Sequence, residues 1–398
     1  MAKLLDIEAP AAPPGAPDAF ALWRLGLRPF YLVASAFASL SIALWAAQYA
    51  GWLRHPYLDG PMWHAHEMIF GFALAVIAGF LLTAVRNWTG RPTPSGAPLI
   101  ALVGLWIAGR VLLLTPYPVA AAAVDTLFPV AVALGIGVPL LRSGNRRNYL
   151  FIGLLLAMAA LDLTEHLSRL GVVALPERYA VQGALDIVLV IMTVMGGRVI
   201  PMFTSNGVRG SAPRRNPMIE RLAPSSAVAL LVADLLQAPS WALIAVLALG
   251  ALVQGLRVWL WRPWQTLRVP LVWVLHAGYL WIPVYLALRA LAEAGALPMP
   301  IAIHALTVGA IGMLTIGMMT RTARGHSGRP LAADRHEVAA YALVGIAAFT
   351  RVVVPLVAMS LYREAVIASA CMWSAAYAIY AVHYWPILTR PRIDGKPG

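Results

Sequence analysis

Residues 64–85 read HAHEMIFGFALAVIAGFLLTAV, a long apolar run that begins with two histidines and a glutamate. After Glu67 it contains no charged residue for the 18 positions that follow, 68–85. A helix needs about 20 predominantly apolar residues to cross the hydrocarbon core of a bilayer. The stretch therefore predicts a membrane-spanning helix with two histidines and an acid at one end.

Similar apolar runs fill the rest of the chain, separated by clusters of proline, glycine and arginine. They predict an all-α membrane protein with about twelve transmembrane helices. The least distinct run is 222–237, which is short and ends next to Pro239. The expected spans are 30–51, 64–85, 97–115, 119–141, 148–168, 179–200, 222–237, 241–261, 270–292, 299–321, 338–359 and 364–388.

Composition supports the membrane class. The chain is 60% hydrophobic and 12% charged, and its mean hydropathy is +0.74. A soluble domain is about 25% charged. The sequence pI near 10.4 would suggest nucleic acid in a soluble protein, but here acids are scarce and the basic residues lie between apolar runs. We therefore predict no nucleic-acid partner.

The basic residues also set the orientation. If the N-terminus is cytoplasmic, 23 of the 30 lysines and arginines fall on the cytoplasmic side, which leaves 30 − 23 = 7 on the other. The bias alternates loop by loop, as the positive-inside rule requires, and a missed helix would invert it. Both termini are thus expected in the cytoplasm. The seven exceptions are Arg54, Arg110, Arg169, Arg178, Arg289, Arg351 and Arg363.

We expect one twelve-helix transmembrane domain over residues 23–390. A disordered, proline-rich cytoplasmic tail is predicted over 1–22 and a short cytoplasmic tail over 391–398. The single cysteine, Cys371, lies in an apolar run and excludes an internal disulfide and a cysteine-rich zinc site. No Walker loop, Gly-x-Ser-x-Gly or His-Glu-x-x-His motif is present.

Two expected helices share a pattern of residues. His66 and His304 each stand five positions before a glycine, 13 before a second glycine, and 23 before Thr-Gly-Arg-Pro or Ser-Gly-Arg-Pro. The span 179–200 ends in a looser version without the histidine. These helices are four apart in chain order, which suggests three parallel four-helix repeats. Helix packing alone would explain the glycines, but not two histidines at one depth.

Histidines inside membrane helices are costly and commonly functional. Two at matching depth suit a haem held between helices by both imidazoles, so we predict His66 and His304 as haem ligands. His64 is the substitute for His66, because the two point about 200° apart around a regular helix. Arg198 and Arg321 are candidates for binding haem carboxylates, although interfacial anchoring explains them better.

The candidates for copper or a second haem are His276, His64, His166 and His326. His276 lies inside the span 270–292, where a neutral imidazole needs a partner, and His166 follows Asp162 and Glu165. Copper accepts imidazole and thioether donors, so nearby methionines are open as ligands, although methionine is also a common packing residue.

Several motifs resemble the NnrS family: LRPFY (27–31), WHAHEMIFGF (63–72), AGFLLTAVRNWTGRP (78–92), GGRVIPMFT (196–204) and GMMTRTARGHSGRP (317–330). The resemblance covers about residues 20–390. It implies a bacterial cytoplasmic-membrane protein that contains haem b and copper. It also implies a role in nitric oxide metabolism and protection from nitrosative stress, often alongside denitrification, with nitric oxide or a related nitrogen oxide as the partner.

The architecture also resembles the catalytic subunit of haem-copper oxidases, in which haem ligands lie on helices 2 and 10. This chain departs from that pattern, because its sixth helix has no histidine and no His-His pair follows on the seventh. The copper triad of those enzymes is therefore missing, and oxidoreductase activity stays an expectation.

Two other classes remain open at this point. A secondary transporter also fits twelve helices with internal repeats, although transporters commonly show inverted repeats and this one is parallel. A haem sensor or accessory protein would bind nitric oxide without turning it over.

Overall fold

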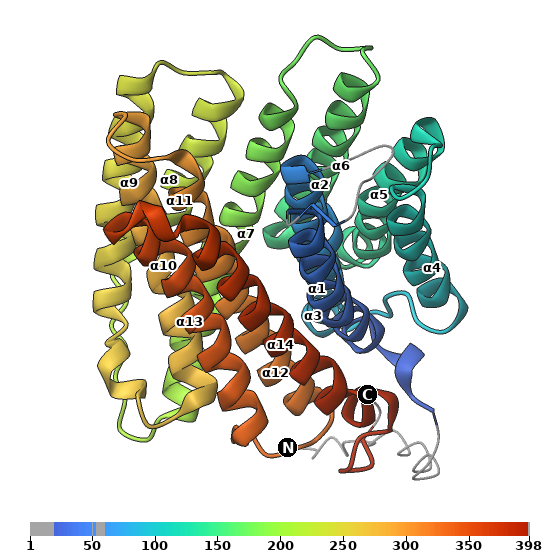
Figure 1. Ribbon diagram of the computed structural model, residues 1–398. Helices are drawn as coiled ribbons and strands as arrows, with labels where there is room; N and C mark the ends of the chain where they lie inside the picture. Colours follow the sequence, from blue (N-terminus) through green and yellow to red (C-terminus); the bar gives the residue numbers. More distant parts are fainter. Residues whose placement is uncertain (1–19, 50, 53–59, 397–398) are drawn as a thin grey trace, which may run out of the picture.

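Twelve continuous helices follow one another along residues 20–49, 51–52 and 60–396, which the computed structural model describes (Figure 1). Helix 2 consists of α2, η2 and α3, and helix 10 of α11, η5 and α12. The elements are α1 (Leu27–Tyr49), α2 (Gly60–His66), η2 (Glu67–Ala73), α3 (Leu74–Thr89), α4 (Ala97–Leu112), α5 (Pro118–Ser143), α6 (Leu150–Arg169), α7 (Glu177–Gly207), α8 (Pro217–Leu235), α9 (Ser240–Leu260), α10 (Pro270–Glu293), α11 (Met299–His304), η5 (Ala305–Gly312), α12 (Met313–His326), α13 (Arg335–Val357) and α14 (Tyr362–Thr389).

Ten of these helices are long and apolar enough to cross a membrane, so the chain is a multi-pass membrane protein. The other two are α4, which has 16 residues, and α8. The all-α membrane fold is confirmed. The least distinct expected span, 222–237, corresponds to α8, and the predicted break at Pro239 separates α8 from α9.

Helix pairs recur at an interval of four helices. Helix α1 packs on α3, α6 packs on α7, and α10 packs on α12. In the same way α5 packs on α6, α9 packs on α10, and α14 packs on α1. Three parallel four-helix units would make these contacts, as the sequence repeat suggests.

The repeated glycines, Gly79 in helix 2 and Gly317 in helix 10, both allow close helix packing. A methyl group at Gly79 would lie 2.8 Å from Cβ of Phe30 on α1, and one at Gly317 would lie 2.8 Å from Cγ1 of Val274 on α10. Both glycines therefore permit the close approach of the preceding helix in their unit.

Helices 2 and 10 each change their hydrogen-bonding pattern at the same point. The π-helical segment η2 starts directly after His66, and η5 starts directly after His304. π-Helical turns are rare and frequently accompany functional sites. The repeated histidines thus mark a shared backbone feature.

Both ends of the described chain lie at one end of the bundle. The backbone N–H of Ala21 donates to the carbonyl of Thr389 at 2.7 Å, and that of Ile393 donates to Ser327 at 3.1 Å. Of the predicted N-terminal tail 1–22, residues 1–19 lie outside the described residues. Leu22 already begins a short 3-10 helix, Leu22–Arg24.

Candidate functional site

A cavity of about 960 Å³ lies at the end of the bundle away from the chain ends. Its walls come from α1, α2, η2, α7, α8, α10, α11, η5, α13 and α14, so residues from all three four-helix units meet there. Its volume is at the upper end of the range for cofactor and small-molecule sites.

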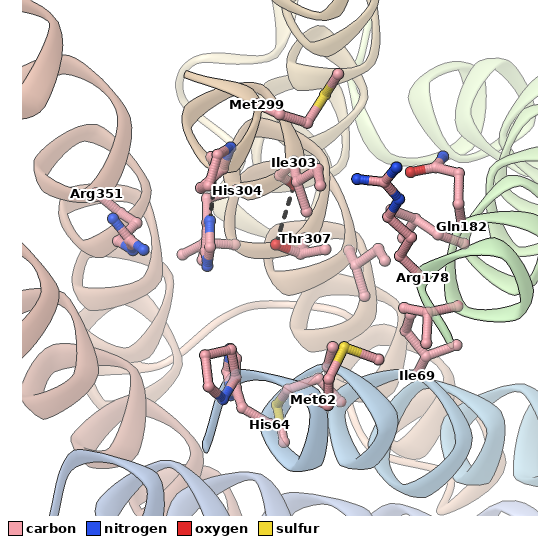
Figure 2. Close-up of a pocket in the computed structure, with 18 of the residues that line it drawn as sticks. Met62, His64, Ile69, Arg178, Gln182, Met299, Ile303, His304, Thr307 and Arg351 are labelled. Carbon is pink, nitrogen blue, oxygen red and sulfur yellow. Dashed lines mark hydrogen bonds between the residues drawn. The ribbon is translucent and has the colours of Figure 1, made fainter. Parts of the chain in front are cut away.

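Two histidines face each other across this cavity. Figure 2 shows His304 of α11 opposite His64 of α2. Their ring centroids are 6.3 Å apart and their planes differ by 7°. A metal–imidazole bond is about 2 Å long. Two such bonds plus the radii of the two rings add up to the observed centroid separation, which is the spacing that one metal ion between two imidazoles would require.

The backbone holds His304 in one orientation. Nδ1 of His304 lies 2.6 Å from the carbonyl oxygen of Pro300, one turn earlier in α11. A carbonyl oxygen only accepts, so Nδ1 carries the proton and donates it. Nε2 is then left with its lone pair free, which is the usual arrangement of a metal-ligating histidine.

His64 is held by ring contact. Its imidazole stacks on the indole of Trp45 in α1, with centroids 5.0 Å apart and planes 16° apart. Its Nδ1 is buried and makes no hydrogen bond within the described part of the chain. A buried polar atom without a partner is rare and calls for an explanation such as an absent ligand.

The cavity walls carry three arginines, of which Arg289 is paired with the acids Asp234 and Glu293 that also line the cavity. Arg351 of α13 donates from Nη2 to the hydroxyl of Tyr362 at 3.0 Å, while its buried Nη1 has no acceptor among the described residues. Arg178 and Gln182 of α7 lie on the opposite side (Figure 2). Guanidinium groups bind carboxylates well, so these walls suit a ligand that carries carboxylates.

His66 does not line this cavity. It lies on the other face of the same helix, completely buried, between two carboxylates. Nε2 of His66 is 2.7 Å from Oδ2 of Asp125 on α5, and Nδ1 is 3.1 Å from Oε2 of Glu165 on α6. The structure therefore pairs His304 with His64, the predicted substitute.

His166 lies beside His66, among the same carboxylates. Nε2 of His166 lies 3.6 Å from Oδ2 of Asp125 and 3.8 Å from Oδ1 of Asp162. Arg110 of α4 forms ion pairs with Glu67 and Asp125. Among the described residues, His66, Asp125, Asp162 and His166 form one of two groups whose ligand atoms lie close enough together, within 4.8 Å, to hold a metal ion.

The other predicted site residues lie outside both regions. Nε2 of His276 is 2.8 Å from the hydroxyl of Thr204, and His326 ends α12. Arg198 donates to Asn148 at 2.7 Å, and the Arg321 guanidinium lies 3.9 Å from the centre of the Phe203 ring. None of the four residues lines the cavity.

Sequence reasoning missed Asp125, Arg110 and Arg351 as site residues. By sequence the two arginines are only basic residues outside the predicted cytoplasmic segments. The sequence did offer a signal, because charged residues inside apolar helices are costly to bury and need partners. Arg110 is 6% exposed and Asp125 is 3% exposed.

Comparison with known proteins agrees with the fold and the motifs. No curated protein matched the chain. A family model described as NnrS protein matches residues 21–392, nearly the whole chain, and the chain therefore belongs to the NnrS family.

Proposed function

We propose that this protein binds haem b and copper and acts in nitric oxide metabolism or protection from nitrosative stress. It would bind or reduce nitric oxide between its transmembrane helices. Membership of the NnrS family supports a role in the nitric oxide response. We place the protein in the bacterial cytoplasmic membrane with both termini in the cytoplasm, because the basic residues follow the positive-inside rule.

The observation that carries this proposal is the His64–His304 pair, with ring centroids 6.3 Å apart in a cavity of about 960 Å³. Two neutral imidazoles are a common ligand set for haem iron. The tautomer of His304 is fixed by Pro300, and the orientation of His64 is fixed by Trp45.

A haem bound here would supply an iron centre for nitrogen oxides and one-electron transfer. The chain's own residues would bind and orient it. Arg351 and Arg178 line the cavity, whereas the predicted Arg198 and Arg321 do not. We therefore assign carboxylate binding to Arg351 and Arg178. Apolar side chains such as Ile69, Phe72 and Ile303 would exclude water from its walls.

Copper is the second proposed cofactor. Beside the two histidines proposed for haem, the cavity is lined by the thioethers of Met62, Met68 and Met299. Imidazole and thioether are the donors that copper accepts in proteins. The support for copper is therefore the donor set of this cavity, together with the resemblance stated above.

Haem content of the purified protein tests the site. We expect His64→Ala and His304→Ala to lose most of the bound haem, measured by the optical spectrum per mole of protein. His276→Ala is the matched control, because His276 is buried outside the cavity, and it should keep wild-type haem content. Full haem content in both cavity variants would contradict the proposal.

Exposure of the reduced protein to nitric oxide tests the reaction. Nitric oxide would have to displace one of the two imidazoles, and this should change the haem spectrum. Consumption of nitric oxide with an electron donor would identify an enzyme. Binding without consumption would identify a sensor or accessory protein. An unchanged spectrum, together with substrate uptake into vesicles, would favour the transporter class instead.

A further inference from the structure

A closed cluster of histidines and carboxylates occupies the face of helix 2 opposite the cavity. We propose that His66, His166, Asp125 and Asp162 bind a divalent first-row cation of the Mn²⁺, Fe²⁺ or Zn²⁺ kind, separate from the haem and copper site. None of the four residues lines the cavity, and each is at most 3% exposed.

The spacing of the ligand atoms suits one ion. Nε2 of His66 is 2.7 Å from Oδ2 of Asp125 and 3.9 Å from Oδ1 of Asp162. Nε2 of His166 is 3.6 Å and 3.8 Å from the same two oxygens. Ligands about 2.1 Å from a metal in tetrahedral geometry lie roughly 3.4 Å apart. Small side-chain movements would therefore bring all four atoms into coordination.

The two ring nitrogens of His66 give the second argument. Both face carboxylates, Glu165 at Nδ1 and Asp125 at Nε2. A neutral imidazole has one N–H, so it can donate to only one of them, and the pair of contacts needs either an imidazolium or a cation at one nitrogen. With a cation among the four ligand atoms, Nε2 binds the metal and Nδ1–H donates to Glu165. That is the carboxylate–histidine–metal arrangement common in protein metal sites.

An oxygen without a partner points into the same space. Oδ1 of Asp162 is buried and forms no hydrogen bond among the described residues, although the hydroxyl of Thr126 donates to its Oδ2 at 2.8 Å. Its nearest basic atoms are the two imidazole nitrogens at 3.8 and 3.9 Å. A buried carboxylate oxygen needs a donor or a cation.

The charges of the cluster favour the same conclusion. Four carboxyl groups (Glu67, Asp125, Asp162 and Glu165) are buried around one guanidinium, that of Arg110. Uncompensated charge within the membrane region is expensive. With all four carboxyl groups ionised and both imidazoles neutral, a divalent cation would offset two of the three negative charges that Arg110 leaves.

The donor set favours divalent ions over Cu⁺. Two imidazoles with carboxylates suit Zn²⁺, Fe²⁺ or Mn²⁺, whereas Cu⁺ prefers thiolate and thioether sulfur. The group contains neither kind of sulfur ligand. The carboxylates also distinguish this cluster from the methionine-containing wall of the cavity.

Metal counting on the purified protein tests the proposal independently of haem. Protein stripped with a chelator is dialysed against Zn²⁺ or Mn²⁺ alone, and bound metal is counted by mass spectrometry per mole of protein. We expect about one ion per chain. Asp162→Asn and His166→Ala should bind roughly tenfold more weakly or worse, because each removes a ligand. His276→Ala replaces a buried histidine outside the cluster and should bind like wild type.

Haem content and size-exclusion profile, measured on the same samples, identify variants that fail to fold. The Asp162→Asn change keeps the side-chain shape, so a folded variant that has lost the ion supports the proposal. Wild-type protein that binds neither Zn²⁺ nor Mn²⁺, binding of Cu⁺ alone, or undiminished metal in both folded cluster variants would overturn it. Loss of haem from His64→Ala with the Zn²⁺ count unchanged would show that the two sites are separate.

Discussion

His64 and His66 stand two residues apart on one helix and have opposite surroundings. His64 faces an open cavity, stacks on Trp45, and is opposed by the neutral His304 imidazole. His66 is completely enclosed and lies between Asp125 and Glu165. The cavity has room for a ligand the size of a cofactor, whereas the cluster has room for an ion.

The difference shows how one membrane helix can serve two sites. On the cavity side, backbone and aromatic contacts orient the imidazoles and leave donor nitrogens uncommitted. On the cluster side, charged partners satisfy most polar atoms, and the arrangement depends on their balance. Removing one charge should therefore damage the cluster far more than a comparable change damages the cavity.

Replacement of Arg110 should have the largest effect on stability. Arg110→Leu leaves Glu67 and Asp125 buried without their cation, and breaking a buried ion pair from one side costs about 3–5 kcal/mol. Thermal unfolding in detergent measures the loss. Arg363→Leu, at an exposed position of α14, is the control and should change stability by less than about 0.5 kcal/mol. Equal stability of the two variants would refute a charge-dependent cluster.

A methyl group at Gly71 should have the next largest effect. It would lie 2.6 Å from Oε2 of Glu67 and 2.9 Å from Nη1 of Arg110. Overpacking of this kind costs about 1–3 kcal/mol. Gly104→Ala on α4 meets nothing within 4 Å and should be neutral or slightly stabilising. If Gly71→Ala unfolds at the same temperature as Gly104→Ala, the packing around the ion pair is looser than described.

Asp334 lies near neither site and should have the smallest effect. Its side chain caps α13 by accepting from the backbone N–H groups of His336 and Glu337. Loss of this cap in Asp334→Ala should cost about 1 kcal/mol. Because Asp334 belongs with His336 and His383 to the other group that could hold a metal ion, the relevant readouts are haem and the ion of the His66 cluster, and both should be kept. Reduced haem or metal content in this variant would mean that the sites depend on general stability.

The same residue predicts a dependence on pH. Burial disfavours its ionised form, but the backbone N–H of Glu337 and neighbouring cations hold the pKa of Asp334 below its usual range. The unfolded carboxyl titrates near pH 4, so the advantage of wild type is complete above that pH. This stability advantage should be lost as the pH falls below about 4 and passes the lower pKa that Asp334 has in the folded state. The stability difference is measured by comparing the unfolding temperatures of wild type and Asp334→Ala across this pH range.

The fold was largely predictable because hydropathy and charge alternation are independent signals of the same helices. All twelve expected spans overlap helices of the structure. The ends differ by a few residues where caps decide them. For example, α8 begins at Pro217, before the expected 222, because Asn216 accepts from the backbone N–H groups of Met218 and Ile219.

The site was only partly predictable. The repeat identified His304 and its depth, but two histidines in helix 2 were available, and their rotation around the helix decides which one faces the partner. Residues two apart point about 200° apart, so only one of His64 and His66 can face α11. The involvement of Asp125 depends on contact between α5 and helix 2, which no local pattern in the sequence specifies.

The π-helical segments after His66 and His304 divide each helix into two parts with different angular phase. The part of helix 2 before η2 directs its histidines, while the part after η2 keeps Gly79 against Phe30. Each residue of an α-helix advances the rotation by about 100°. Deleting one residue within η2 or η5 would restore continuous α-helix and turn one part by about that angle. Either the histidines or the packing glycines would then lose their contacts. The orientation of the histidines at one end of the bundle therefore depends on the same two turns as the helix packing at the other end.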